Sequence, residues 1–199
     1  MTRIILASTS VARKQMLENA GLSFDVMAPM VDEVAIKQAL LAEGLGPRSI
    51  ADGLAEAKAI KLSGKNPEAL VIGADQVLAF DDGPLFDKPD NPETARAQLA
   101  HMAGKSHHLL SAVVIAQSGA PQWRHVGVVR MHVRPLSSDF IDSYVERNWN
   151  SISHCVGCYQ IEGEGAQLFT RIEGDYFDIM GLPLLPLLAY LRERKEMPS

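Results

Sequence analysis

The chain has 199 residues, of which 47% are hydrophobic and 22% are charged. These values are those of an ordinary globular protein, so low-complexity disorder and a collagen-like architecture are excluded. The length favours one domain, or two lobes that share one core. Nineteen basic residues against 24 acidic residues give a net charge of −5, which argues against a protein that coats DNA or RNA.

No segment of the sequence has the character of a membrane span or a secretion signal. The richest apolar stretch, residues 180–191, is interrupted by two prolines, whereas a spanning helix needs about 20 apolar residues. The apolar run at residues 4–7 is too short for a signal peptide. With only two cysteines, the chain is not a disulfide scaffold. We therefore expect a cytoplasmic protein with no membrane association.

The first half of the chain alternates between short apolar runs and segments with helical spacing. In chain order, we expect a strand at 4–6, a helix at about 12–20 and a strand at 24–28. A further helix is expected from a cap at Ser49 to about residue 62, followed by a strand at 70–80 that residues 73–75 interrupt. Serine is a favoured helix cap, and Gly64 is suited to the end of that helix.

The second half continues the alternation. We expect a turn at 81–84 with residues 85–86 pairing back as a hairpin, then a helix from Asn91-Pro92 to Gly104. Strands at 108–116 and 124–133, joined by a turn at 118–121, are followed by a helix from Ser138, a strand at 168–172 and a helix from Pro183 to about 195. Because at least two adjacent strand pairs are expected to be antiparallel, the sequence predicts an α/β protein with a mixed sheet, in one domain spanning 1–199.

Residues 8–14 form the most informative stretch, because a buried strand there leads through hydroxyl side chains into a helix. Arg13 and Lys14 lie in the first turn of that helix, where positive charge opposes the helix dipole. This placement is favourable if an anion binds there, because free backbone N–H groups and the hydroxyls of Ser8 and Ser10 would hold phosphate oxygens. The alternative is an exposed helix start with two solvated cations.

Acidic residues occur at two points that follow or interrupt strands. Asp32 and Glu33 come after the second predicted strand and could hold a hard cation such as Mg²⁺, although acidic pairs are also common in ordinary loops. Asp75 interrupts an apolar strand, where a carboxylate is costly unless it is paired or binds a metal. Gly73 beside it would let a ligand or another backbone approach closely.

Other candidates are weaker. Pro89 makes Lys88 project from a stiff extended segment, and helical geometry does not distinguish Lys58 from Lys61 as the inward-facing lysine. The triplet at 104–106 is not a P-loop, because the chain lacks the earlier glycine that this motif requires. Cys155 and Cys158 are interpreted as ordinary buried or half-buried, inert thiols, since neither a second metal-binding pair nor a thioredoxin-like context is present.

Taken in chain order, a set of short motifs resembles those of the Maf family over nearly the whole sequence. They are Leu6-Ala7-Ser8-Thr9-Ser10 with Arg13, Val31-Asp32-Glu33, Ala55-Glu56-Ala57-Lys58-Ala59, Gly73-Ala74-Asp75-Gln76-Val77, Lys88-Pro89, Gly104-Lys105-Ser106-His107, Tyr159-Gln160-Ile161-Glu162-Gly163, and Gly174-Asp175 through Gly181-Leu182-Pro183-Leu184. Maf proteins are cytoplasmic nucleoside triphosphate pyrophosphatases, also described as septum-formation inhibitors. The resemblance implies an inosine triphosphate pyrophosphatase-like fold, with an elongated mixed sheet and two α/β lobes around a cleft, and it implies a homodimer as one expected state.

The resemblance also implies hydrolysis of a nucleoside triphosphate to a nucleoside monophosphate and pyrophosphate, with a divalent cation (Mg²⁺ or Mn²⁺) as cofactor. By motif, the phosphates would be held by Ser8, Ser10 and Arg13, and the metal by Glu33 and Asp75. Asp75 would also accept the proton of the attacking water, and the triphosphate charge would be neutralised by Lys58 and Lys88. Phosphoryl transfer depends mostly on positioning and charge stabilisation, so such a set is chemically sufficient.

The sequence departs from the family pattern after Ser10, where Val11 and Ala12 replace the usual proline and first arginine. Two glutamines are candidates for base recognition, and they give different signals. Gln76 lies in a motif like that of the branch that prefers 7-methyl-GTP, whereas Gln160 lies in a motif like that of the dTTP and UTP branch. The missing arginine motivates an alternative function, a nucleotide-binding regulator of cell division with little turnover.

Overall fold

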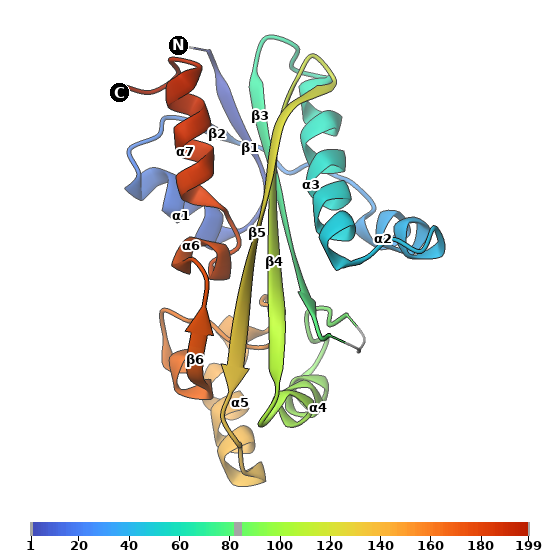
Figure 1. The fold of residues 1–199 in the computed structure, drawn as a ribbon, viewed down its shortest axis with the longest axis vertical. Coiled ribbons are helices and arrows are strands. Elements are labelled where there is room, and N and C mark those ends of the chain that lie inside the picture. Colours follow the sequence, from blue (N-terminus) through green and yellow to red (C-terminus); the bar gives the residue numbers. More distant parts are fainter. Residues whose placement is uncertain (1, 82–84, 199) are drawn as a thin grey trace. The chain divides into compact units, whose positions relative to one another are not determined.

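The computed structural model describes residues 2–81 and 85–198, and six strands form one sheet in the order β2-β1-β3-β4-β5-β6 (Figure 1). The strands are β1 (Ile4–Ala7), β2 (Asp25–Val26), β3 (Leu70–Ala79), β4 (Ser106–Gln117), β5 (Ala120–Val133) and β6 (Phe169–Glu173). Strand β1 pairs in parallel with β2 and β3, whereas β5 and β6 are antiparallel. The predicted mixed α/β fold is therefore confirmed.

Helices account for most of the remaining described chain. They are α1 (Val11–Asn19), α2 (Glu33–Ala42), α3 (Pro47–Ser63), α4 (Pro92–Met102), α5 (Ser138–Ile152), α6 (Tyr176–Ile179) and α7 (Leu184–Glu193), with a 3-10 helix η1 (Glu164–Leu168). None of the helices in the described ranges is both long and apolar enough to cross a bilayer.

The chain divides into two compact units. Unit 1 comprises Met1–Gln76, Ser111–Gly127 and Tyr176–Ser199, and unit 2 comprises Val77–Leu110 and Val128–Asp175. Strands β3, β4 and β5 each contribute residues to both units.

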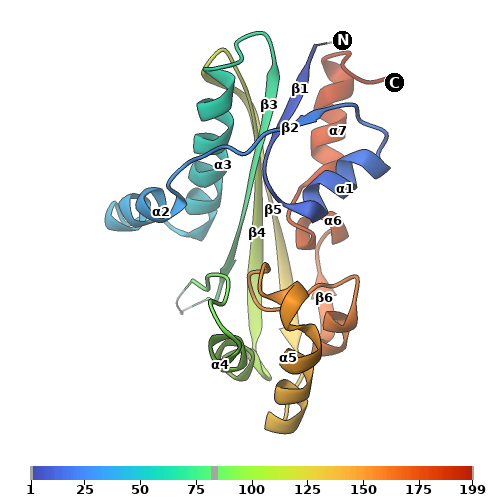
Figure 2. The same ribbon diagram turned by 180° about the vertical axis from the view of Figure 1, so that it is seen from behind.

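In unit 1, helices cover both faces of the β1–β3 part of the sheet. Because side chains alternate along a strand, Leu6 and Ile72 pack on one face against the core cluster that includes Leu17 of α1 and Leu187 of α7. Val71 packs on the other face with Leu62 of α3. Figures 1 and 2 show α1 and α7 on one side of β1 and β3, and α3 on the opposite side. Asp75 is separated from Val71 by an even number of positions on β3, so its side chain lies on the same face of the sheet, which α3 covers.

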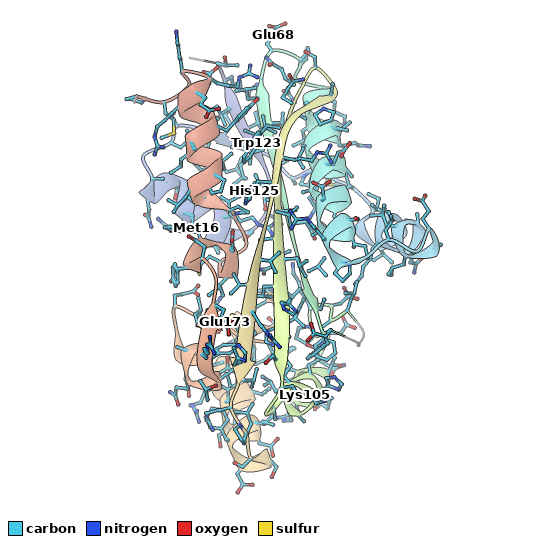
Figure 3. The ribbon with its side chains drawn as sticks, in the orientation of Figure 1. Met16, Glu68, Lys105, Trp123, His125 and Glu173 are labelled. Atoms are coloured by element: carbon cyan, nitrogen blue, oxygen red, sulfur yellow. The ribbon has the colours of Figure 1, made fainter. Side chains whose placement is uncertain are left out.

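Stacked aromatic rings connect β5 to α7 within unit 1. The rings of Trp123 and Tyr190 are nearly parallel, with their centroids 5.0 Å apart. His125 also stacks on Trp123, with a centroid distance of 6.2 Å, and both labelled side chains come from β5 (Figure 3). Offset parallel rings at such separations are favourable arrangements of aromatic side chains.

Unit 2 contains α4 and α5, which are linked by an ion pair between Arg96 Nε and Asp142 Oδ1 at 2.9 Å. The predicted return of the chain at 85–86 is confirmed as an antiparallel bridge between Leu78 and Phe86, whereas residues 82–84 of the predicted turn lie outside the described residues. His107 is fully buried, and burial lowers its pKa to about 3, so its imidazole is neutral.

Several predicted boundaries are wrong. The α3 helix is capped by Gly46 with a proline at its start, so Ser49 lies inside the helix. Strand β3 is continuous through residues 73–75, because Asp75 has a buried partner that keeps the carboxylate within the sheet. Strand β2 has only two residues. At the β4–β5 turn, Ser118 and Gly119 both have positive φ, a two-residue geometry that suits the twist of a hairpin and lets β5 begin at Ala120.

Three elements have no counterpart in the prediction: α2, η1 and α6. Helix α2 begins where Asp32 Oδ1 accepts the backbone N–H of Ala35 at 2.9 Å, so the aspartate acts as a cap. None of the α2 residues is buried, so its apolar side chains are not part of the protein core.

Candidate functional site

The predicted phosphate-binding turn is formed at the carboxyl end of β1. The Ser10 backbone N–H donates to Ser8 Oγ at 3.1 Å, and Ser10 Oγ accepts the backbone N–H of Arg13 at 3.4 Å. Ser10 is therefore the cap of α1. This cap forms with Val11 in place of proline, and the Val11 side chain is 80% exposed. The structure thus brings Ser8, Ser10 and Arg13 together, as predicted.

The Arg13 guanidinium is fixed by backbone carbonyls from two distant segments. Its Nε donates to Gly181 O at 2.8 Å, and its Nη1 donates to Ala74 O at 3.0 Å. Desolvation lowers the pKa of Arg13, and the negative charges of Asp75 and Glu33 oppose that shift. Because guanidinium donors form a rigid planar fork, fixing Nε and Nη1 also fixes the direction of Nη2.

Asp75, Lys58 and Glu33 form a charged cluster beside this turn in unit 1. Lys58 Nζ lies 2.6 Å from Asp75 Oδ1 and 3.0 Å from Glu33 Oε1. Lys58 and Asp75 are 5% and 7% exposed, whereas the Glu33 side chain is 53% exposed. The lysine, which lies on α3, thus joins a carboxylate on β3 to one at the start of α2.

Gly73 is the reason that α3 approaches β3 closely enough for this ion pair. A Cβ atom at Gly73 would lie 2.2 Å from Ala55 O and 2.7 Å from Ala59 N. The helix backbone therefore occupies the space that a side chain would need. Helix packing against Gly73 directs Lys58 toward β3, while Lys61 on the same helix is exposed. The structure resolves which lysine faces inward.

Ser111, which the sequence analysis did not single out, supports the Arg13 site together with Gln76. Ser111 Oγ donates to Asp178 O at 2.6 Å, and the Gln76 amide donates to Ser111 Oγ, Asp178 O and Ile179 O, each at 3.0 Å. These bonds hold the end of α6, from which Gly181 presents its carbonyl to Arg13. The available signal was Ser111 itself, a hydroxyl within the apolar run of β4.

Gly181→Ala is expected to raise KM for a triphosphate substrate by about tenfold, the equivalent of about 1.4 kcal/mol. Gly181 has a φ of +92°, which alanine adopts only with strain, and its carbonyl accepts the hydrogen bond from Arg13 Nε, so the strain would shift the group that holds Arg13. Steady-state kinetics measure the effect. Gly21→Ala is the matched control, because Gly21 has a φ of +73° and a Cβ atom added there would have no neighbour within 4 Å. An equal KM increase in both variants would contradict the displacement of Arg13.

The remaining site candidates lie in unit 2. Lys88 is exposed, and the adjacent Pro89 is buried. Gln160 partly offsets the rise that burial causes in the pKa of Cys155, and it lies between Tyr159 and the loop that leads to η1. Their predicted roles toward a nucleotide remain predictions. Gln76 likewise remains a predicted base-recognition residue, although its side-chain amide nitrogen is bonded within unit 1.

The two cysteines are free thiols. Burial raises the pKa of Cys155, and it raises the pKa of Cys158 to about 12. Since the thiolate is the reactive form of cysteine, these shifts disfavour reaction of either thiol. These properties agree with the interpretation of the pair as inert.

The donor set of the cluster suits a magnesium ion that is bound together with a phosphate ligand. Within residues 2–81 and 85–198, no group of three or more His, Cys, Asp or Glu side chains could hold a metal ion. Glu33 and Asp75 provide two carboxylates, and Mg²⁺ in phosphate-transfer sites is bound by one or two carboxylates with water and substrate oxygens. The residues present therefore fit a shared site, not a complete protein cage.

Comparisons with known proteins match nearly the whole chain. The family model described as Maf-like protein matches residues 3–194. A protein of Ruegeria pomeroyi named nucleoside triphosphate pyrophosphatase is 54% identical over 191 residues, which cover 96% of each chain. A Caulobacter vibrioides protein of the same name is 51% identical over 192 residues and 96% of each chain. A Brucella abortus protein named 7-methyl-GTP pyrophosphatase is 48% identical over 193 residues, which cover 97% of this chain and 96% of the relative.

Proposed function

Because this chain belongs to the Maf-like protein family, we propose that it hydrolyses nucleoside triphosphates to a nucleoside monophosphate and pyrophosphate. The names of its relatives support this activity. The single observation that carries it is the buried Asp75 carboxylate, which lies on β3 and is paired with Lys58 beside the Ser8–Arg13 turn. A carboxylate and cations in one site are the groups that phosphoryl transfer requires.

The turn at residues 8–13 binds the phosphates in this proposal. The hydroxyls of Ser8 and Ser10 and the N-terminal backbone of α1 offer hydrogen bonds to phosphate oxygens. Arg13 is already held by Gly181 and Ala74 through Nε and Nη1, so its guanidinium is oriented before substrate binds. Such preorganisation lowers the cost of positioning the triphosphate.

Asp75 acts as the proton acceptor. Water attacks the α-phosphorus, its proton passes to the Asp75 carboxylate, and the bond from the α-phosphorus to the bridging oxygen breaks with pyrophosphate as the leaving group. A positioned general base typically accelerates such a step by about 10²–10⁴-fold. Glu33 and Asp75 would hold Mg²⁺ or Mn²⁺, which would supply positive charge to the triphosphate when bound. Lys88 is proposed to contribute a further cation.

The proposed substrates are modified or surplus nucleotides. The two candidate kinds are 7-methyl-GTP, and the pair dTTP and UTP. The Brucella abortus relative is named for 7-methyl-GTP, which supports including this nucleotide. Gln76 and Gln160 are the proposed base-recognition residues, and single Gln→Ala variants of each should change the ratio of kcat/KM between the two kinds of substrate.

The purified chain is expected to release one pyrophosphate for each nucleoside monophosphate when it is incubated with Mg²⁺ or Mn²⁺ and a panel of triphosphates. The panel includes 7-methyl-GTP, GTP, dTTP and UTP, and both products are quantified in the same reaction. Release of inorganic phosphate instead would indicate cleavage at the γ-phosphate and would contradict the proposal. A chain that binds nucleotides without any turnover would support the alternative, a nucleotide-binding regulator of cell division.

A further inference from the structure

Lys58 occupies a central position between the two carboxylates that are proposed to hold the divalent cation. Its Nζ is 2.6 Å from Asp75 Oδ1 and 3.0 Å from Glu33 Oε1. Both distances are those of charge-assisted hydrogen bonds. One ammonium therefore already binds an oxygen of each proposed metal ligand.

The position of this ammonium is enforced by the fold. Lys58 is 5% exposed, and α3 is pressed against β3 at Gly73, where a Cβ would meet the backbone of Ala55 and Ala59. The helix cannot approach more closely, and the side chain lies in the interface between helix and strand. The ammonium is thus held near Asp75 by the packing of the elements as well as by its charge.

A divalent cation that binds the same two carboxylates must compete with this ammonium. Two carboxylates with one ammonium leave a single net negative charge to attract the metal. The ammonium itself would repel a divalent cation that binds close to it. The free protein is therefore a poor site for a metal ion by itself. A bound triphosphate changes the balance, because its oxygens offer the ammonium a new partner and supply further ligands for the metal.

We propose that Lys58 is an internal competitor for the divalent cation, so that the metal binds together with the nucleotide and not to the free chain. The flexible four-carbon stem of lysine lets the ammonium move from Asp75 to a phosphate oxygen while α3 stays in place. This inference rests on the proposed function, because it assumes that a triphosphate binds beside the Lys58 cluster.

The test is Mn²⁺ binding without nucleotide, measured by calorimetry and by the electron paramagnetic resonance signal of free Mn²⁺. The wild-type chain is expected to bind with a dissociation constant above about 1 mM, and Lys58→Gln is expected to bind one Mn²⁺ about tenfold more tightly or better. Adding Glu33→Gln to that variant should remove the gain. Lys61→Gln, on the same helix but exposed, is the matched control and should bind like the wild type.

Thermal unfolding gives a second readout, because a ligand that binds only the folded chain raises Tm. Lys58→Gln leaves a buried carboxylate without its partner and should lower Tm, and Mn²⁺ that saturates this variant should raise its Tm by about 5 °C and that of the wild type by less than half as much. A Lys58→Gln chain that neither binds Mn²⁺ more tightly nor regains Tm with it overturns the inference. So does a wild-type chain that binds one Mn²⁺ at micromolar concentration with Glu33 as a ligand.

The two proposals fail in different ways. Hydrolysis of a triphosphate by the wild-type chain is measured in the same buffer as Mn²⁺ binding. If hydrolysis occurs and Lys58→Gln has unchanged Mn²⁺ affinity, the proposed function stands and the competitor role of Lys58 is wrong. If no triphosphate is hydrolysed, the proposed function itself is wrong, whatever the metal affinity.

Discussion

Asp75→Asn is expected to lower kcat for triphosphate hydrolysis by about a thousandfold. Asparagine keeps the shape of the side chain, but it cannot accept a proton from water at neutral pH. The substitution also removes the charge partner of Lys58, which lies 2.6 Å from Asp75 Oδ1. The loss should appear mainly in kcat, because Arg13 keeps its bonds to Gly181 and Ala74.

Product formation in single-turnover reactions measures the loss in the chemical step. Binding of a non-cleavable nucleotide measures any loss of substrate affinity. Nucleotide affinity should fall far less than kcat. Asp139→Asn serves as a control, because Asp139 is an exposed acid in the first turn of α5 in unit 2. An Asp75→Asn enzyme that retains more than about a tenth of wild-type kcat contradicts the role of Asp75 as proton acceptor.

Gly73→Ala is expected to lower Tm by about 5–10 °C and to reduce hydrolysis strongly. The added Cβ would lie 2.2 Å from Ala55 O and 2.7 Å from Ala59 N, so β3 and α3 must separate. Overpacking of this kind costs about 1–3 kcal/mol or more, and each kcal/mol lowers Tm by about 2–4 °C in a chain of this size. Separation of the two elements would also pull Lys58 away from Asp75.

Thermal unfolding and steady-state kinetics measure both effects in the same preparation. Gly64→Ala is the matched control at the end of α3, because a Cβ there would meet Ile60 O at an ordinary contact distance of 3.5 Å. That variant should keep wild-type Tm and kcat. A Gly73→Ala chain with Tm within about 2 °C of the wild type and unchanged kcat would show that close packing of α3 on β3 is not needed.

Elements with strong local signals were predicted from the sequence. The turn from β1 into α1, the start of α4 at Asn91-Pro92 and the last helix after Pro183 all occur where expected. Each depends on capping side chains and apolar spacing within a few residues. Helix α2 was not predicted, although Asp32 caps it, and its apolar residues Val34 and Leu41 are 67% and 46% exposed.

The candidate site likewise has one part with a local sequence signal and one part without. The Ser8–Arg13 turn is local, and its residue types and spacing predict a phosphate-binding geometry. The junction of Glu33, Lys58 and Asp75 is formed by three elements that are distant in sequence, and spacing on α3 could not choose between Lys58 and Lys61. The choice depends on contact between α3 and Gly73, which is a tertiary property. The homodimer and the metal remain predictions.

A crystal structure of the chain with Mg²⁺ and an α,β-methylene nucleoside triphosphate tests the central claim most directly. The triphosphate should lie at the amino end of α1, hydrogen-bonded to Ser8, Ser10 and Arg13, with its α-phosphate facing the Asp75 carboxylate. A nucleotide bound elsewhere in the chain, with those side chains making no contact to its phosphates, would contradict the account.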